Sequence, residues 1–134
     1  MKLEIFTDGA ARGNPGPAAI GVVIYNEEKA VVEECKEYIG NTTNNTAEYS
    51  ALLAGLKAAK KYAPCSICFF LDSELVVHQM NGRWRVKDAN LSMLNAKARE
   101  LVRDFEKVEF KYVPREQNKL ADSLANQALD SAGK

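Results

Sequence analysis

Four acidic residues occupy positions in this sequence where strands and helices are expected to begin or end. Asp8 closes a hydrophobic segment and precedes a glycine-rich turn, and Asp72 follows the apolar run 66–71. Glu48 and Asp122 fall early in two later helical patterns. Hard divalent cations prefer oxygen ligands, and a pair of such ions roughly 4 Å apart needs several carboxylates around it. The four acids therefore indicate one metal site with space for a substrate phosphate.

Each acid also has an ordinary structural explanation. The chain contains 18 Asp and Glu residues, most of which are expected on the solvated surface. A carboxylate that follows a strand is often a helix cap, and Asp72 before Ser73 and Glu74 fits that description. The four sequence contexts taken together favour the metal site over four separate structural roles.

Hydrophobic periodicity predicts the elements that must position these acids. Alternating or continuous apolar segments predict strands over residues 2–8, 18–25, 30–39, 66–71 and 107–113. Apolar residues at helical spacing predict helices over 47–59, 74–80 and 90–105, and a C-terminal helix marked by Leu120, Leu124 and Ala128.

This order of elements predicts an α/β fold with a mixed five-stranded sheet. Three antiparallel strands come first, two parallel strands are added through helical crossovers, and helices cover both faces. In such sheets, sites form beyond the carboxyl ends of strands. Adjacent first and fourth strands would bring Asp8 and Asp72 together. We expect one domain over residues 1–134.

Composition restricts the function further. The 18 basic and 18 acidic residues cancel, which argues against nucleic-acid binding through a large positive field. No apolar run approaches the roughly 20 residues that span a bilayer, so we expect a soluble cytoplasmic protein without membrane association. Cys35, Cys65 and Cys68 are interpreted as buried thiols, with a redox or metal role for the CxxC pair as the alternative and their disulfide state left open.

Four motifs resemble those of type 1 ribonuclease H, a family with retroviral and archaeal-like branches. They are TDGAARGNPGP, TTNNTAEYSAL, LDSELVV and VPREQNKLADSLANQA, in the family's order and spacing. The resemblance covers nearly the whole chain. It implies the same five-stranded fold and hydrolysis of the RNA strand of an RNA/DNA hybrid, which leaves a 5′-phosphate and a 3′-hydroxyl.

The resemblance also implies roles for the acids, with two Mg²⁺ ions, or Mn²⁺ as a substitute, as cofactor. Asp8 would bridge both ions, Asp72 and Glu48 would hold the ion beside the leaving oxygen, and Asp122 would help hold the ion that carries the attacking water. Glu48 would also lie close to the RNA 2′-hydroxyl.

Further residues match substrate contacts of the family. The RNA strand would be met by Gly9, Ala10, Arg12, Asn14 and Ser73. Asn44 and Asn45 would reach base edges in the minor groove, with helix capping as the alternative for either residue. Thr43 matches a DNA-phosphate contact. Trp84 matches an aromatic residue near the DNA strand, although a lone tryptophan also serves core or hinge packing.

The sequence departs from the family in three places. The lysine-rich protrusion that bacterial members carry after the region of Trp84 is absent, so this is a short form with a weaker expected grip on substrate. The loop before the last acid lacks a histidine, and Glu116, with Arg115, is the candidate substitute. Asn41 and Asp88 stand where a basic residue and an asparagine are common in the phosphate pocket, and His78, the only histidine, is interpreted as surface or groove-lining.

Two other functions fit the same motifs. One is a non-catalytic module that binds hybrids, and the other, motivated by the altered phosphate pocket, is a nuclease acting on duplex RNA. Nothing in the sequence suggests an obligatory oligomer, and we expect a monomer.

Overall fold

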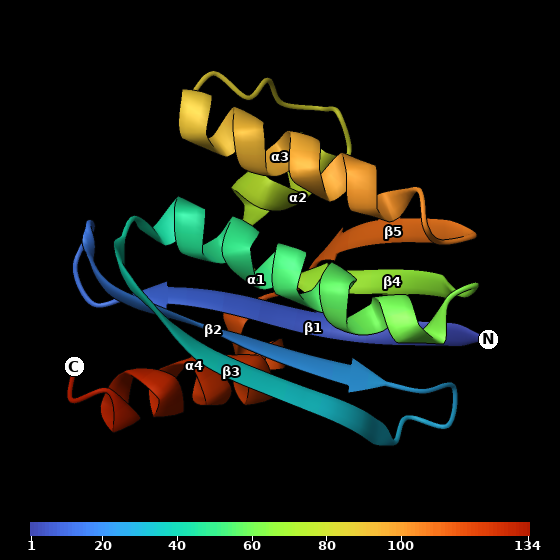
Figure 1. Ribbon diagram of the computed structural model, residues 1–134, viewed down its shortest axis with the longest axis horizontal. Helices are drawn as coiled ribbons and strands as arrows, with labels where there is room; N and C mark the ends of the chain where they lie inside the picture. The colour runs from blue at the N-terminus through green and yellow to red at the C-terminus, as the bar shows by residue number, and fades with distance from the viewer.

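A five-stranded mixed sheet forms the centre of the molecule. The computed structural model describes all residues from Met1 to Lys134. The strands are β1 (Lys2–Ala11), β2 (Gly16–Tyr25), β3 (Val31–Thr42), β4 (Ser66–Leu71) and β5 (Lys107–Tyr112), in the spatial order β3-β2-β1-β4-β5 (Figure 1). β1 to β3 pair antiparallel, whereas β4 is parallel to both β1 and β5. The predicted fold class is confirmed.

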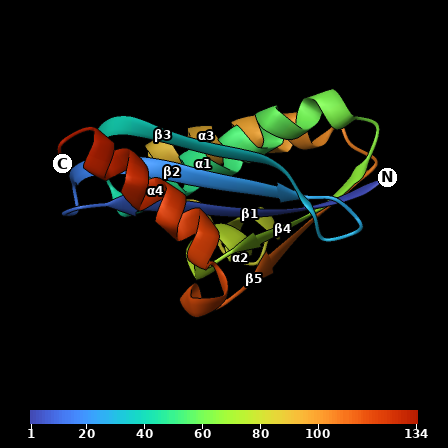
Figure 2. The same ribbon diagram turned by 90° about the horizontal axis from the view of Figure 1, so that it is seen from below.

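Helices cover both faces of this sheet. α1 (Asn44–Ala59) packs on β1 and β2 on one face, with α2 (Glu74–Met80) and α3 (Ala89–Val102) beside it. α4 (Lys119–Ser131) lies alone across β1, β2 and β3 on the opposite face (Figure 2). Short 3₁₀ turns at Lys60–Tyr62 and Arg115–Gln117 complete the chain. No helix is both long and apolar enough to cross a membrane.

Four predicted boundaries differ at the end of the molecule where the acids gather: β2 begins at Gly16 instead of Ala18, β3 ends at Thr42 instead of Ile39, and β1 and α1 are each three residues longer. β1 does not end at Asp8 but continues to Ala11, because β2 pairs with it as far as Ala11 opposite Ala18. Asp8 therefore lies inside a strand. α1 begins at Asn44 instead of Ala47, because the Thr43 side chain accepts a hydrogen bond from the Thr46 amide and caps the helix three residues earlier.

The main core lies between the sheet and α1. Its largest fully buried side chains include Tyr49, Phe69 and Leu52. Cys65 and Cys68 are buried, as predicted, and Cys35 is partly buried; all three are free thiols. Burial raises the pKa of each thiol, which keeps it protonated and unreactive.

A buried polar network joins the three helices on this face. The Tyr49 hydroxyl of α1 donates to Gln79 Oε1 of α2 over 2.7 Å and accepts from Asn95 Nδ2 of α3 over 3.1 Å. Arg99 donates to Asn95 Oδ1 and to the main-chain oxygens of Gln79 and Met80. These bonds fix α2 and α3, which flank the segment that carries Trp84.

Tyr49→Phe should therefore destabilise the protein without removing core volume. It leaves a buried acceptor on Gln79 and a buried donor on Asn95 unpaired, a loss of about 1–3 kcal/mol in the free energy of unfolding. Urea denaturation measures this loss. Tyr112→Phe, at a side chain that is 46% exposed, is the matched control and should change little. Equal effects of the two substitutions would contradict the role given to the network.

Candidate active site

Three carboxylates from three separate parts of the chain converge: Asp8 lies within β1, Asp72 directly follows β4, and Glu48 lies in α1. Ligand oxygens of Asp8, Glu48 and Asp72 all lie within 4.8 Å of one another. The parallel pairing of β1 with β4, which reaches Thr7 opposite Leu71, places Asp8 beside Asp72. Glu48 comes from the first turns of α1. The acids line a pocket of about 380 Å³, and the predicted cluster is present.

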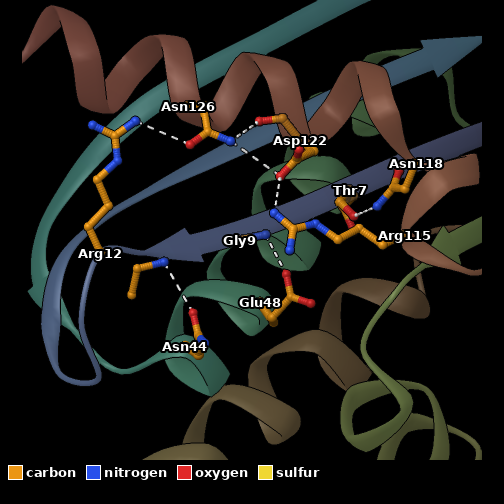
Figure 3. A network of polar contacts seen from close by, with 10 residues as sticks. Thr7, Gly9, Arg12, Asn44, Glu48, Arg115, Asn118, Asp122 and Asn126 are labelled. Atoms are coloured by element: carbon orange, nitrogen blue, oxygen red, sulfur yellow. Dashed lines mark hydrogen bonds and ion pairs between the residues drawn. The ribbon is translucent and has the colours of Figure 1, made fainter.

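Asp122 belongs to the same pocket but lies outside the closest group of three. It extends from the first turn of α4 and lines the pocket opposite Glu48. Its side chain is near enough to Asp8 to help raise the pKa of that residue. Arg115 Nη2 lies 3.6 Å from Asp122 Oδ1, so a cation reaches the site from the loop before α4 (Figure 3).

Glycine at position 9 lets α1 approach β1 closely. A methyl group at Gly9 would lie 2.2 Å from the main-chain carbonyl of Ala47, which is an overlap of backbone with side chain. The Gly9 amide donates to Glu48 Oε1 at this contact (Figure 3). Gly9 therefore positions Glu48, in addition to the substrate role expected from the sequence.

A second glycine does the same on the other face. Gly21 of β2 pairs directly with Asp8, and a methyl group there would lie 2.1 Å from the Ala121 carbonyl oxygen of α4. The missing side chain lets α4 lie against the sheet at the level of Asp8. This contact brings Asp122 to the site, and the sequence analysis gave no role to Gly21.

The acids disfavour their own ionisation. Burial raises the pKa of Asp8, and the nearby charges of Glu48 and Asp72 raise it further. Burial also raises the pKa of Glu48, as does Asp72, while the Gly9 amide acts in the opposite direction. A group of oxygen donors with mutual repulsion fits a hard divalent cation, whose charge removes the repulsion. The donor set therefore suits the metal expected from the sequence.

The turn between β1 and β2 is tied to both adjacent helices. Asn14 Oδ1 accepts from the Asn44 amide over 3.0 Å, and Asn44 Oδ1 accepts from the Ala11 amide over 3.1 Å. Arg12 forms an ion pair with Asp130 of α4 at 2.8 Å. The predicted substrate residues that line the acid pocket itself are Gly9, Ala10, Asn44, Asn45 and Ser73.

A second pocket, of about 420 Å³, lies next to the first between the β3–α1 junction and the start of α3. Thr43, Asn14 and Asn45 line it together with Asp88 and Asn90. Asp88 caps α3 by accepting from the Leu91 amide, and Asn90 donates to Thr46 Oγ1. Asn90 thus supplies an asparagine to this pocket, although the sequence analysis found Asp88 at the position where the family commonly has one. No lysine or arginine lines the pocket.

The loop before α4 presents Arg115 to the acids. Arg115 lines their pocket, whereas Glu116 is exposed and does not. Trp84 lies outside both pockets, 46% exposed, with its ring 4.4 Å from that of His78. This exposure excludes the core-packing alternative for Trp84.

The comparisons with known proteins agree with this geometry. A family model described as reverse transcriptase-like matches residues 6–128. The crystal structure of RNase H1 from the archaeon Halobacterium salinarum superposes with a TM-score of 0.95 at 43% identity, covering 98% of this chain and 99% of that one. The chain belongs to the ribonuclease HI family. Curated ribonuclease HI of the same archaeon is 44% identical over 131 residues, which are 98% of this chain and 66% of the relative.

Two more members of the ribonuclease HI family are informative. LC11-RNase H1, solved in complex with an RNA/DNA hybrid, superposes with a TM-score of 0.94 at 41% identity and covers 98% of this chain and 99% of that one. The bifunctional protein Rv2228c of Mycobacterium tuberculosis is 45% identical over 133 residues. This chain covers only 36% of that longer relative.

Removing one acid should stabilise the metal-free protein. A carboxyl whose pKa is raised on folding contributes stability at low pH that is lost as the pH rises toward the folded-state pKa. Asp8→Asn should therefore raise the free energy of unfolding by on the order of 1–2 kcal/mol at neutral pH. The gain should be small near pH 4, about the ordinary pKa of aspartate.

Urea denaturation over a pH series in metal-free buffer measures this gain. Glu28→Gln, on the exposed β2–β3 turn, is the control and should show no such pH dependence. A gain for Asp8→Asn that does not vary with pH would contradict the electrostatic explanation.

Proposed function

We propose that this chain is a metal-dependent endonuclease that cuts the RNA strand of RNA/DNA hybrids. The products are a 5′-phosphate and a 3′-hydroxyl. The convergence of the Asp8, Glu48 and Asp72 oxygens within 4.8 Å, with Asp122 beside them, carries the proposal. The hybrid complex of LC11-RNase H1, a relative of the same length and fold, supports the substrate.

Asp8, Glu48, Asp72 and Asp122 are the proposed metal ligands, for Mg²⁺ with Mn²⁺ as a substitute. Bound there, the metal lowers the pKa of the attacking water and stabilises charge on the leaving oxygen. The protein's contribution is the fixed placement of the carboxylates: Asp8, Glu48 and Asp122 lie within regular elements, and Asp72 lies in the two-residue connection between β4 and α2.

The surface around the acids offers the contacts that a hybrid needs. On one side, Ala10 lines the pocket with a small side chain, which allows an RNA sugar to approach, and Gly9 lines it with main chain while its missing side chain makes room for α1. Asn45 lines both pockets, so its amide lies between the acids and the neighbouring pocket of Thr43. Ser73 lines the acid pocket, and Trp84 offers an exposed ring for the DNA strand.

Arg115 is proposed to take the role for which the sequence suggested Glu116. A guanidinium can donate two parallel hydrogen bonds to two oxygens of a phosphate, whereas an ionised carboxylate has no hydrogen to donate. Its contact with Asp122 is long and its side chain is 78% exposed, so the ion pair itself contributes little to stability. The cation is therefore free to meet the scissile phosphate.

The second pocket, which contains Thr43 and so corresponds to the phosphate pocket expected from the family resemblance, affects the choice of substrate. It has no cationic side chain and contains the Asp88 carboxylate, so its discrimination for a DNA strand rests on hydroxyl and amide groups. Duplex RNA is accordingly the second candidate substrate.

We further propose that the chain acts as a single cytoplasmic domain and as a monomer.

Asp72→Asn should lower cleavage of the hybrid by more than about a thousand-fold, because a lost metal ligand removes several kcal/mol of transition-state stabilisation. End-labelled RNA/DNA, RNA/RNA, DNA/DNA and single-stranded RNA, each with Mg²⁺, Mn²⁺ or chelator, define the activity. The control variant is Asp104→Asn, which changes a surface residue whose carboxylate lies 3.8 Å from Lys60 Nζ. This variant should cut the hybrid at the wild-type rate.

Hybrid binding without any cutting by the wild-type protein would favour the non-catalytic module instead. Equal cutting of RNA/RNA and RNA/DNA would favour the broader nuclease.

Arg115→Ala should lower the rate constant for cleavage by roughly 10- to 100-fold, the loss of one exposed donor to the developing charge. Glu116→Gln, at the adjacent position, should stay within about two-fold of the wild type. Single-turnover kinetics on the hybrid separate the two. The reverse order of effects would restore Glu116 as the functional residue of this loop.

A further inference from the structure

Asn126 lies one helical turn after Asp122 on α4 and makes three polar contacts at the edge of the site. Its Nδ2 donates to the main-chain oxygen of Asp122 over 3.0 Å and to the carboxylate Oδ1 of Asp122 over 3.3 Å. Its Oδ1 accepts from Arg12 Nη2 over 3.2 Å (Figure 3). The amide therefore lies between the β1–β2 turn and a proposed metal ligand.

The chemistry of the partners fixes the orientation of this amide. A guanidinium can only donate, so it must face the amide oxygen. A main-chain carbonyl and a carboxylate can only accept, so they must face the amide nitrogen. Turning the Asn126 side chain over would place like groups against each other at all three contacts. Only one orientation satisfies Arg12 and Asp122 together.

Arg12 is held on its other side by Asp130, one turn further along α4, at 2.8 Å. The chain of contacts thus runs from Asp130 through Arg12 and Asn126 to Asp122. It connects the turn expected to meet the RNA strand with the carboxylate expected to hold a metal ion.

The contacts at Asp122 are directed at a single oxygen. Asn126 Nδ2 and Arg115 Nη2 both approach Oδ1, at 3.3 Å and 3.6 Å. The hydrogen bond from Asn126 restricts the rotation of the carboxylate, whereas the longer Arg115 contact adds only a nearby positive charge. Groups that hold ligands in this way commonly change metal affinity or activity by about 10- to 100-fold when they are replaced.

We propose that Asn126 is a positioning residue for the nuclease reaction, which orients the Asp122 carboxylate and is itself held in place by Arg12. This inference rests on the proposed function. Arg12 then affects the cleavage rate in part by holding Asn126 in place, in addition to any direct contact of Arg12 with RNA.

Asn126→Asp tests the proposal with almost no change of shape. The substituted carboxylate keeps an acceptor for Arg12 but turns the donor toward Asp122 into a repelling oxygen. We expect kcat on the hybrid to fall about 10- to 100-fold with KM within about two-fold, and the Mg²⁺ concentration for half activation to rise. Calorimetry without substrate should show about ten-fold weaker Mg²⁺ binding.

Gln127→Glu is the matched control at the next position of α4. Gln127 also donates to the side chain one turn earlier, Ser123, and accepts from a cation, Lys36, but neither of these partners lines the acid pocket. Gln127→Glu, like Asn126→Asp, replaces an amide by a carboxylate of the same shape and so adds one negative charge. Its kcat, metal activation and Mg²⁺ binding should match those of the wild type.

Asn126→Ala provides a second variant that adds no charge and should lower kcat about ten-fold. The Arg12→Ala substitution should lower kcat less in this background than in the wild type, because the path through Asn126 is already lost. Circular dichroism and thermal unfolding confirm that each compared variant is folded.

The outcomes separate this inference from the function on which it rests. A wild-type protein that cuts no hybrid would overturn the proposed function. A wild-type protein that cuts, with Asn126→Asp and Asn126→Ala both at normal kcat and normal Mg²⁺ binding, would overturn only the role of Asn126. Equal losses in Asn126→Asp and Gln127→Glu would also overturn it, since added charge on α4 would then explain the effect.

Discussion

At two places a helix backbone lies directly against the sheet backbone, and both contacts flank Asp8. Gly9 follows Asp8 in β1 and meets the start of α1, and Gly21 pairs with Asp8 across β2 and meets the start of α4. Both added methyl groups would overlap main-chain atoms. The two helices thus approach the same level of the sheet from opposite faces. Glu48 and Asp122 reach Asp8 because no side chain separates the layers.

This arrangement places like charges together at a cost in stability. Desolvation and mutual repulsion raise the pKa of Asp8 and of Glu48, so the folded state without metal opposes their full ionisation. The fold tolerates this because the core between the sheet and α1 is closely packed and its buried polar atoms are largely paired. The acids are held in place by their elements, not by attraction for one another.

The existence and order of the five strands, and the proximity of Asp8 and Asp72, could be predicted from the sequence. Periodicity identified five strands, and the rule for parallel strands brought the ends of β1 and β4 together. The extension of β1 to Ala11 was missed, because it depends on pairing with β2 and not on local alternation. Propensity likewise placed the start of α1 too late, since the cap at Thr43 was read as part of a general polar cluster.

The side-chain contacts at the edge of the site were beyond reach of the sequence. Arg115 and Glu116 are neighbours, and only the path of the 3₁₀ turn before α4 decides which of them faces the acids. Asn126 stood within a quoted motif without a role, because its contact with Arg12 joins residues 114 positions apart. One signal was available: positions 122, 126 and 130 recur at helical spacing and share one face of α4.

β1 is continuous through Asp8 to Ala11, and the turn that follows is fastened on both sides, by Asn44 and by α4. Ala10, which is expected to meet the RNA strand, and Asp8, a proposed metal ligand, therefore belong to one strand, whose rise is about 3.3 Å per residue. Two residues of one paired strand keep a fixed separation. Under the proposed function, the distance along the RNA from this contact to the cut would be constant and independent of the base sequence.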